Sequence, residues 1–191
     1  MFYIPTMDKS SLLKSPGEAT KEEWIHGKQI VRPRPASPHI FLSSRLGTIL
    51  MSPYQFGFGG PGGWVFADEP EIHLGDPPHK LVPDLAAWKI EHTSKDMKVA
   101  TFISQIPDWV CEVFSPSTTW VDKVQKLPLY TQYGVSHVWY IDPLEQVLDV
   151  MRLEKGHYLL LGTYNQFETI DLEPFGPVRL ELLWDKDISN L

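Results

Sequence analysis

Two carboxylates and one lysine stand out because each lies in or next to an apolar segment. Asp84 lies in LVPDLAAWK, Glu112 lies in WVCEVF, and Lys126 follows in VDKVQKLPLY. An ionised acid in an apolar strand is costly unless a cation meets it. Two such acids on neighbouring strands supply the oxygen ligands that Mg²⁺ or Mn²⁺ prefers, with water and a substrate phosphate completing the coordination. The pattern therefore predicts a divalent-metal hydrolase, since such a metal activates water and stabilises charge on phosphorus.

Each of these residues also has an interpretation without chemistry. Glu112 shares its strand face with Val110 and Phe114, and it could be an edge-strand acid that reaches solvent or pairs with an arginine. Lys126 follows Asp122 by one helical turn, and an exposed pair at that spacing contributes only about 0.3–0.5 kcal/mol. The alternative turns Lys126 toward the carboxylates, where its ammonium orients water or offsets phosphate charge. The sequence alone does not choose between the two.

Three further groups complete the predicted site. Glu71, in EPEIHL, adds a third carboxylate from the first strand unless it lies at a solvated strand end. Glu23 reaches the site from an N-terminal turn unless it lies at an exposed helix end. The backbone carbonyl of Val113 is a further oxygen ligand for the metal. The predicted catalytic residues are therefore Asp84, Glu112, Lys126, Glu71 and Glu23, and the predicted metal ligands are Asp84, Glu112 and Val113.

Histidine and cysteine suggest no competing centre. The histidines lack i,i+4 pairs and cysteine partners, which argues against zinc. His39 is expected at the start of a helix, as a surface or capping residue. The single cysteine, Cys111, excludes an internal disulfide framework and fits a reducing cytoplasm. It alternates with Glu112, so it should point into the opposite apolar layer, with no base positioned to make it a nucleophile.

A sheet and helices must position these residues. A glycine-rich loop at 57–63 reads as flexible and not as a phosphate cradle, because no Lys-Ser/Thr pair follows it. Pro128 should kink or break the second long helix, which ends at Gly134. A crossover helix permits a parallel neighbour, so the order of elements predicts a mixed sheet. The expected helical segments are residues 18–23, 40–51 and 119–133, and the expected strands are 64–74, 81–89, 109–114, 137–141, 146–153 and 158–163.

Bulk properties are those of an ordinary globular protein. The 191 residues contain 42% hydrophobic and 21% charged side chains, which suits a single domain over 21–191 after a flexible segment at 1–20. No apolar run approaches the roughly 20 residues of a membrane span, and no secretory signal is present, so a cytoplasmic location is expected. The net charge of −7 argues against nonspecific binding of a phosphate backbone. A locally basic groove stays open, with Lys28, Arg32 and Arg34 as candidates.

Several motifs resemble the Uma2 family, a group of bacterial proteins related to PD-(D/E)xK nucleases. The matching segments are VPDLAAWK, PDWVCEVFSPST and DKVQKLPLYTQYGVSHVWYIDP, with EEWIHGK, SPHIFLSSRLGTIL and EPEIHLG upstream. They cover most of residues 20–165 in a compatible order and spacing. The resemblance implies an α/β (α+β) fold: a restriction-endonuclease-like mixed sheet flanked by helices, with additional C-terminal strands. It also implies Mg²⁺-dependent cleavage of phosphodiester bonds in DNA, with Asp84 as the acid of the PD motif.

The chain departs from the family pattern at two positions. Glu112 corresponds to the acid of the second motif, which should end in lysine two residues later, where this chain has Phe114. Lys126, on the following helix, matches the place where the family keeps its lysine. Glu23 corresponds to the acid of the N-terminal segment, but His26 replaces the usual acidic residue before the glycine.

Two alternatives to a DNA nuclease stay open. The acidic balance and Phe114 favour a non-catalytic interaction protein that keeps the nuclease fold. A nuclease acting on RNA or on single strands is compatible with the resemblance, although no aromatic stacking motif supports it. Nuclease-fold proteins often act as homodimers, because two sites are needed to cut both strands, and the proline- and tryptophan-rich flanks could form such an interface.

Overall fold

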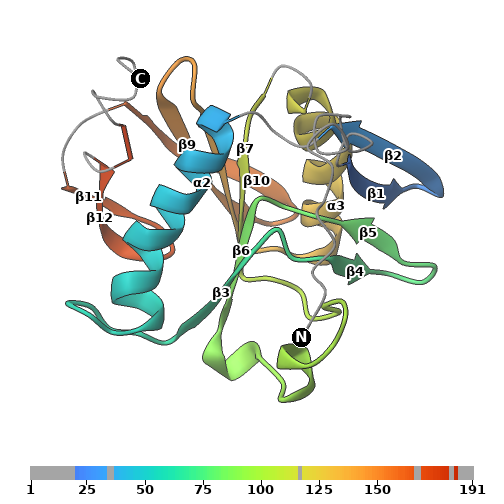
Figure 1. Ribbon diagram of the computed structural model, residues 1–191, viewed down its shortest axis with the longest axis horizontal. Coiled ribbons are helices and arrows are strands. Elements are labelled where there is room, and N and C mark those ends of the chain that lie inside the picture. The colour runs from blue at the N-terminus through green and yellow to red at the C-terminus, as the bar shows by residue number, and fades with distance from the viewer. Residues whose placement is uncertain (1–19, 34–36, 116–117, 166–168, 181–182, 185–191) are drawn as a thin grey trace, which may run out of the picture.

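A six-stranded mixed sheet forms the centre of the molecule (Figure 1). The computed structural model describes residues 20–33, 37–115, 118–165, 169–180 and 183–184, so the segment expected to be flexible lies outside it except for Thr20. The strand order is β10-β9-β8-β7-β6-β3, and β7 and β8 are parallel as predicted. The strands are β3 (Trp64–Asp68), β6 (Leu85–Lys89), β7 (Trp109–Val113), β8 (His137–Asp142), β9 (Val147–Glu154) and β10 (His157–Tyr164).

Two smaller sheets accompany the central one. A four-stranded sheet has the order β2-β1-β5-β4, and a two-stranded sheet pairs β11 with β12. The four-stranded sheet consists of β1 (Thr20–Ile25), β2 (Lys28–Pro33), β4 (Ile72–Leu74) and β5 (His79–Leu81). The two-stranded sheet consists of β11 (Thr169–Leu172) and β12 (Gly176–Arg179). The predicted α+β class, with additional C-terminal strands, is confirmed.

The expected helical turn at 18–23 is wrong, because the described part of that segment belongs to strand β1. Glu23 and Ile25 are buried while Trp24 between them is exposed, which is the two-residue alternation of a strand. His26 and Gly27 both have positive φ, 51° and 71°, and so form the tight turn that returns the chain as β2. The tight turn at His26 and Gly27 favours a β-hairpin, and this preference decides the structure of the residues before it over their weak helical pattern.

Two of the predicted strands are each broken into two. Residues 64–74 divide into β3 and β4, and residues 81–89 contain only the end of β5 before β6 begins. Each break has a proline, Pro70 or Pro83, which cannot donate to a strand ladder. Both breaks carry the chain between the central sheet and the four-stranded sheet, and they lie side by side, since the Glu69 N–H donates to the Asp84 carbonyl at 3.0 Å. Asp84 therefore lies in a bend at the junction of two sheets and not within a strand.

Two helical segments cover opposite faces of the central sheet (Figure 1). The predicted N-terminal helix is confirmed as α2 (Ser37–Leu50), followed by a π-helical turn η1 (Met51–Gln55). Leu42, Leu46 and Leu50 pack in the core on the side of the β11–β12 pair, which also contains Cys111. The opposite core contains Val110, Phe114 and the second helical segment. Cys111 and Glu112 thus point to opposite layers, as the strand alternation predicts.

The second helical segment accommodates Pro128 by widening the turns before it. It consists of π-helical η4 (Val121–Lys126) and α3 (Leu127–Tyr133), and it ends at Gly134, which has φ 82°. The Leu127 N–H bonds to the Asp122 carbonyl, five residues back, at the start of the turn that holds the proline. Since Pro128 lies in the first turn of α3, its missing N–H costs little there. Within the described ranges, no helix has the length and apolar character to cross a bilayer.

Helix α2 should contribute stability through its buried face alone. Replacing fully buried Leu46 with alanine should lower the free energy of unfolding by about 2–5 kcal/mol, because it leaves a cavity against the sheet. The control is Ile40→Ala on the same helix, where the side chain is 52% exposed and the change should stay within about 0.5 kcal/mol. Urea unfolding curves measure both. Equal losses for the two variants would contradict this packing.

Candidate active site

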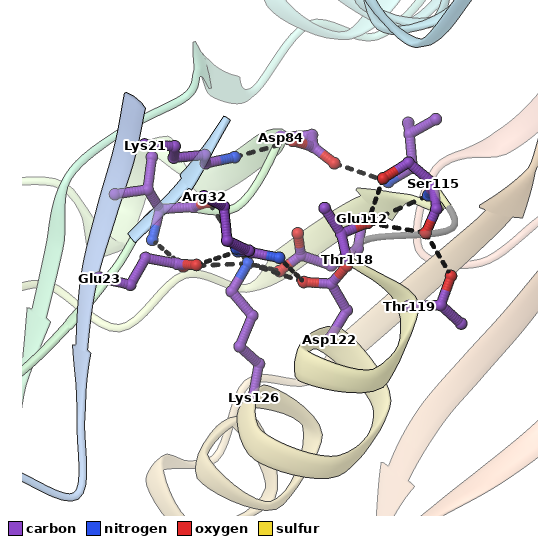
Figure 2. Close-up of polar contacts among 12 residues, drawn as sticks. Lys21, Glu23, Arg32, Asp84, Glu112, Ser115, Thr118, Thr119, Asp122 and Lys126 are labelled. Carbon is purple, nitrogen blue, oxygen red and sulfur yellow. Dashed lines mark hydrogen bonds and ion pairs between the residues drawn. The ribbon is translucent and has the colours of Figure 1, made fainter. Parts of the chain in front are cut away.

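Buried charges from five parts of the chain converge beside the C-terminal end of β7. Figure 2 shows side chains from β1, β2, the β5–β6 bend, β7 and η4 pointing toward one another. Nine buried polar or charged side chains are found among the described residues, and most of them belong to this cluster or touch it. The members considered below are Lys21, Glu23, Arg32, His39, Asp84, Glu112, Asp122, Lys126 and Tyr130.

Asp84 is held by donors on both of its carboxylate oxygens. Oδ1 accepts a hydrogen bond from Lys21 Nζ at 2.9 Å, and Oδ2 accepts one from the Val113 N–H at 2.7 Å. His39 Nε2 lies 3.0 Å from the same Oδ2. Burial raises the pKa of the Asp84 carboxyl, but the His39 hydrogen bond and the Lys21 charge outweigh it, so the pKa lies below its usual value. Asp84 is therefore an ionised carboxylate across the physiological pH range.

Glu112 is more deeply buried and less stabilised as an anion. Its Oε1 accepts hydrogen bonds from Lys126 Nζ at 2.8 Å and from the Tyr130 hydroxyl at 2.6 Å. Burial raises the pKa of the Glu112 carboxyl to about 8, and the charges of Asp122 and Asp84 add to the rise, although Lys126 opposes it. A positive charge added next to Glu112 would therefore lower its pKa and release its proton near neutral pH.

Lys126 is the central cation of the cluster. Its ammonium is fully buried and lies 2.8 Å from Glu112 Oε1, 3.1 Å from Glu23 Oε1 and 3.2 Å from Asp122 Oδ1. Burial alone would lower the pKa of Lys126, but these carboxylates raise it well above its ordinary value. The interpretation as an exposed i,i+4 pair is wrong: the pair with Asp122 exists, but it is buried and shared with two other acids.

Glu23 and Arg32 bring the β1–β2 hairpin into the cluster. Glu23 is fully buried, and its Oε1 accepts a hydrogen bond from the Val82 N–H at 2.8 Å. Its Oε2 pairs with Arg32 Nη2, while Arg32 Nη1 lies 3.6 Å from Asp122 Oδ1. Burial raises the pKa of the Glu23 carboxyl, but the charges of Lys126 and Arg32 outweigh burial, so the pKa lies below its ordinary value. The alternative of an exposed helix end for Glu23 is therefore wrong, and buried Arg32 does not belong to an open basic groove; Arg34 lies outside the described residues.

His39 was expected as a surface or capping residue at the start of the helix, and the surface alternative is wrong. Its side chain is only 6% exposed, because the first turn of α2 packs against the β5–β6 bend through the contact with Asp84. The helical period could have shown this, since His39 precedes buried Leu42 and Leu46 by three and seven residues. Lys21 was also missed. It shares a strand face with Glu23, a relation that is visible only once 20–25 is recognised as a strand.

The structure does not bring Glu71 to the other predicted site residues. Its Oε1 lies 2.8 Å from His73 Nε2 and its Oε2 lies 2.7 Å from Lys80 Nζ, both on the four-stranded sheet. The side chain is 36% exposed. Burial slightly raises the pKa of Glu71, but its two basic partners outweigh this and lower it. The solvated strand end matches this position, and a role for Glu71 in catalysis stays a prediction.

The cluster offers oxygen ligands and little space for a divalent cation. Asp84, Glu112 and Asp122 line a cavity of about 10 Å³, which is room for one body the size of a water molecule. Asp122 Oδ1 makes no hydrogen bond among the described residues, although it forms ion pairs with Lys126 and Arg32. No three His, Cys, Asp or Glu side chains in these ranges are placed to hold a metal by themselves. Carboxylate oxygens are the ligands that Mg²⁺ prefers, so the donor chemistry suits such an ion, while the space as it stands admits one body of about its size.

Comparison with solved structures gives the class of protein. The chain is similar to a putative nuclease belonging to DUF820 from Anabaena variabilis ATCC 29413, with a TM-score of 0.65 and 21% identity over 91% of this chain and 95% of that chain. This likeness shows a restriction-endonuclease-like fold. No curated protein matches the chain. The model of the Uma2 family, described as putative restriction endonuclease, matches residues 10–184, and the chain therefore belongs to the Uma2 family.

Removing the central cation should destabilise the fold strongly. Lys126→Met leaves three buried carboxylates without their common partner, and we expect a loss of about 3–5 kcal/mol in the free energy of unfolding near neutral pH. Lys126 is the charge that most lowers the pKa values of Glu23 and Glu112, so both values rise when it is removed. Stability is consequently lost as pH rises, and the difference from wild type should shrink as pH falls toward about 4.

The matched control for this measurement is Lys123→Met on the same helical segment. Lys123 is exposed and lies over the Phe114 ring at 4.5 Å, so its replacement should cost no more than about 1 kcal/mol. Urea unfolding at several pH values measures both variants. Similar losses for the two, or a Lys126→Met loss that does not change with pH, would show that Lys126 does not hold the acids together.

Proposed function

We propose that this protein is a metal-dependent nuclease that hydrolyses phosphodiester bonds in DNA. The observation that supports it most is the 2.8 Å contact between Lys126 and Glu112. It supplies from the following helix the amine that the second motif lacks at Phe114. The family description and the fold point to the same class of reaction.

Asp84, Glu112 and the Val113 carbonyl would hold Mg²⁺ or Mn²⁺. Once bound, such an ion supplies an activated water and a positive charge for the phosphate. Lys126 stays protonated because its pKa lies far above neutrality, so it acts as a hydrogen-bond donor and a fixed charge and not as a base. Glu23 and Tyr130 keep Lys126 and Glu112 in place, and Lys21 and His39 orient Asp84.

We also propose the setting in which this activity operates. Cutting both strands of a duplex takes two such sites, so two copies of the chain would act together as a homodimer. The absence of an internal disulfide framework suits a cytoplasmic protein. The homodimer follows from the proposed reaction and is refuted if that reaction is refuted.

A second candidate function is a non-catalytic protein that keeps the nuclease fold. One feature favours it: protein donors already meet both oxygens of Asp84 and Oε1 of Glu112. In that case the cluster serves only to hold the sheets together. Titration with Mn²⁺ separates the two candidates, because an inert scaffold shows no heat that depends on these carboxylates.

Loss of the first acid should abolish DNA cleavage. With Mg²⁺ or Mn²⁺, the wild-type protein should nick supercoiled plasmid, and Asp84→Asn should be at least about 100-fold slower because it removes a metal ligand and its charge. The control Glu145→Gln alters an exposed acid in the β8–β9 turn and should cleave like wild type. Nicking by Asp84→Asn at the wild-type rate would refute the assignment.

Metal affinity should increase with pH. Glu112 has a pKa of about 8, so below this value a proton competes with the cation for its carboxylate. The apparent affinity for Mn²⁺ should therefore rise by about tenfold per pH unit from about pH 6 to about pH 8 and then level off. Isothermal titration at several pH values measures this. Glu112→Gln should bind weakly at every pH, and a flat wild-type profile would exclude Glu112 as a ligand.

A further inference from the structure

A groove extends from Asp84 along α2 and away from the buried cluster. Three cavities of about 190, 340 and 520 Å³ lie along α2: the first and second adjoin on the flank of α2 toward β3 and β6, and the third lies on the flank toward the β11–β12 pair, across Thr48 and Ser52. The first and second share Ser43, Ser44 and Asp68, and the second and third share Thr48 and Ser52. We call this the α2 groove. It runs between α2 and the β11–β12 pair at its far end, on the side of the sheet opposite α3 (Figure 1).

The lining of the α2 groove changes character along its length. Carboxylates are confined to the first cavity and its border, where Asp68, Glu69 and Asp84 lie. Beyond Asp68, the described lining residues carry no acid, and the third cavity includes Arg179. Hydroxyl groups recur along the lining. Those of Ser43 and Thr48 already donate to the carbonyls of His39 and Ser44. The hydroxyls that can donate to phosphate oxygens belong to Ser44, Ser52 and Thr169.

Two phenylalanines stand exposed along the same groove. Phe56 lines the second cavity and is 59% exposed, and Phe58 lines the third and is 74% exposed. Their ring centroids are 6.2 Å apart and the rings are tilted by 36°. Exposed aromatic faces next to polar donors are the surface on which unpaired bases stack.

The glycine-rich loop that carries Phe58 and follows Phe56 makes defined backbone contacts with the turn before it. The Phe58 N–H donates to the Ser52 carbonyl and the Gly62 N–H donates to the Pro53 carbonyl, both at 2.9 Å. A Cβ at Gly60 would lie 2.4 Å from Pro53 Cβ and 2.8 Å from its carbonyl oxygen, so only glycine allows this close approach. The two rings are therefore positioned before any ligand arrives.

The inner end of the α2 groove has an unmet polar group. His39 lines the first cavity, is only 6% exposed, and its Nδ1 has no hydrogen-bond partner among the described residues. A buried ring nitrogen without a partner has hydrogen-bonding capacity that a water or a ligand group can satisfy. A water or a ligand group next to Asp84 can satisfy this nitrogen, at the opposite end of the groove from Phe58.

We propose that the α2 groove binds a single, unpaired nucleic-acid strand and leads it to Asp84. The bases stack on Phe56 and Phe58, and the backbone follows the hydroxyl groups toward the first cavity. Bases within a duplex are already stacked and paired, so they cannot use these rings. The role of the Asp84 end rests on the nuclease function proposed above. The substrate is accordingly a single strand, or a duplex with an unpaired segment such as a negatively supercoiled plasmid supplies.

Binding without cleavage tests the groove by itself. The probe is a fluorescein-labelled oligothymidylate of about 12 nucleotides, compared by anisotropy with a blunt duplex of the same length, in EDTA. The single strand should bind at least about 10-fold more tightly. The logarithm of its affinity should fall with the logarithm of salt concentration with a slope no steeper than about −1, because one cation, Arg179, lines the described part of the second and third cavities.

Variants locate the binding. Phe56→Ala and Phe58→Ala should each weaken binding of the oligothymidylate by about 10-fold, because each removes a stacking surface. Both side chains are exposed, so thermal unfolding should not change. Phe102→Ala is the matched control: Phe102 is also exposed, at 44%, but it stacks on His73 outside the lining of the groove. Its affinity should equal that of wild type.

The outcomes separate the groove from the nuclease. Equal affinity for single strand and duplex, or unchanged affinity in Phe56→Ala and Phe58→Ala, would overturn the proposed groove. Strand binding that depends on these rings, in a protein that cleaves nothing with Mg²⁺ or Mn²⁺, would support the groove and refute the nuclease. If Phe58→Ala cleaves a duplex at the wild-type rate and no strand binding is found, the result would support the nuclease and refute the groove.

Discussion

The buried ammonium of Lys126 is the interaction on which the rest of the structure depends. It meets carboxylates from three elements: Glu23 on β1, Glu112 on β7 and Asp122 on η4. Any one of these charges, buried without the others, would cost several kcal/mol. The four-stranded sheet, the central sheet and the second helical segment must therefore pack together in one arrangement. The same contacts that fix this arrangement also bring the two motif acids to the lining of one small cavity.

The cluster has more acidic than basic side chains, and the excess negative charge raises the pKa of Glu112. Four buried carboxylates, those of Glu23, Asp84, Glu112 and Asp122, face three charged side chains, those of Lys21, Arg32 and Lys126. Asp84 and Glu23 keep lowered pKa values because donors surround them, whereas the pKa of Glu112 rises to about 8. Two acids of one site are thus driven apart in pKa by their surroundings. Such a separation is typical of sites that bind an added cation or transfer protons.

The sequence predicted the central sheet, both long helices and the three residues Asp84, Glu112 and Lys126, because each is marked by its own local pattern. It did not predict Lys21 and His39 as the partners of Asp84. Lys21 lies 63 positions and His39 lies 45 positions from Asp84, and no periodicity connects segments so far apart. The break at Asp84 was missed for a related reason. An apolar run with one proline fits both a single strand and a strand that changes sheets, and only tertiary packing decides.

The pair of Asp84 and His39 forms the boundary between the buried cluster and the α2 groove, since both residues line the cavity on either side. On one side lie Glu112, Asp122 and the buried cations, in a space for a single water. On the other side lies a groove large enough for a polymer strand. This division explains how a protein of net charge −7 could admit a polyanion. The acids of the cluster lie behind the boundary among Lys21, Arg32 and Lys126, and on the groove side Asp68 and Glu69 are confined to the first cavity next to Asp84. Beyond them, hydroxyl groups and aromatic rings, which repel no phosphate, form the approach. A nucleic acid would then meet the carboxylates only at the end of the groove where Asp84 lies.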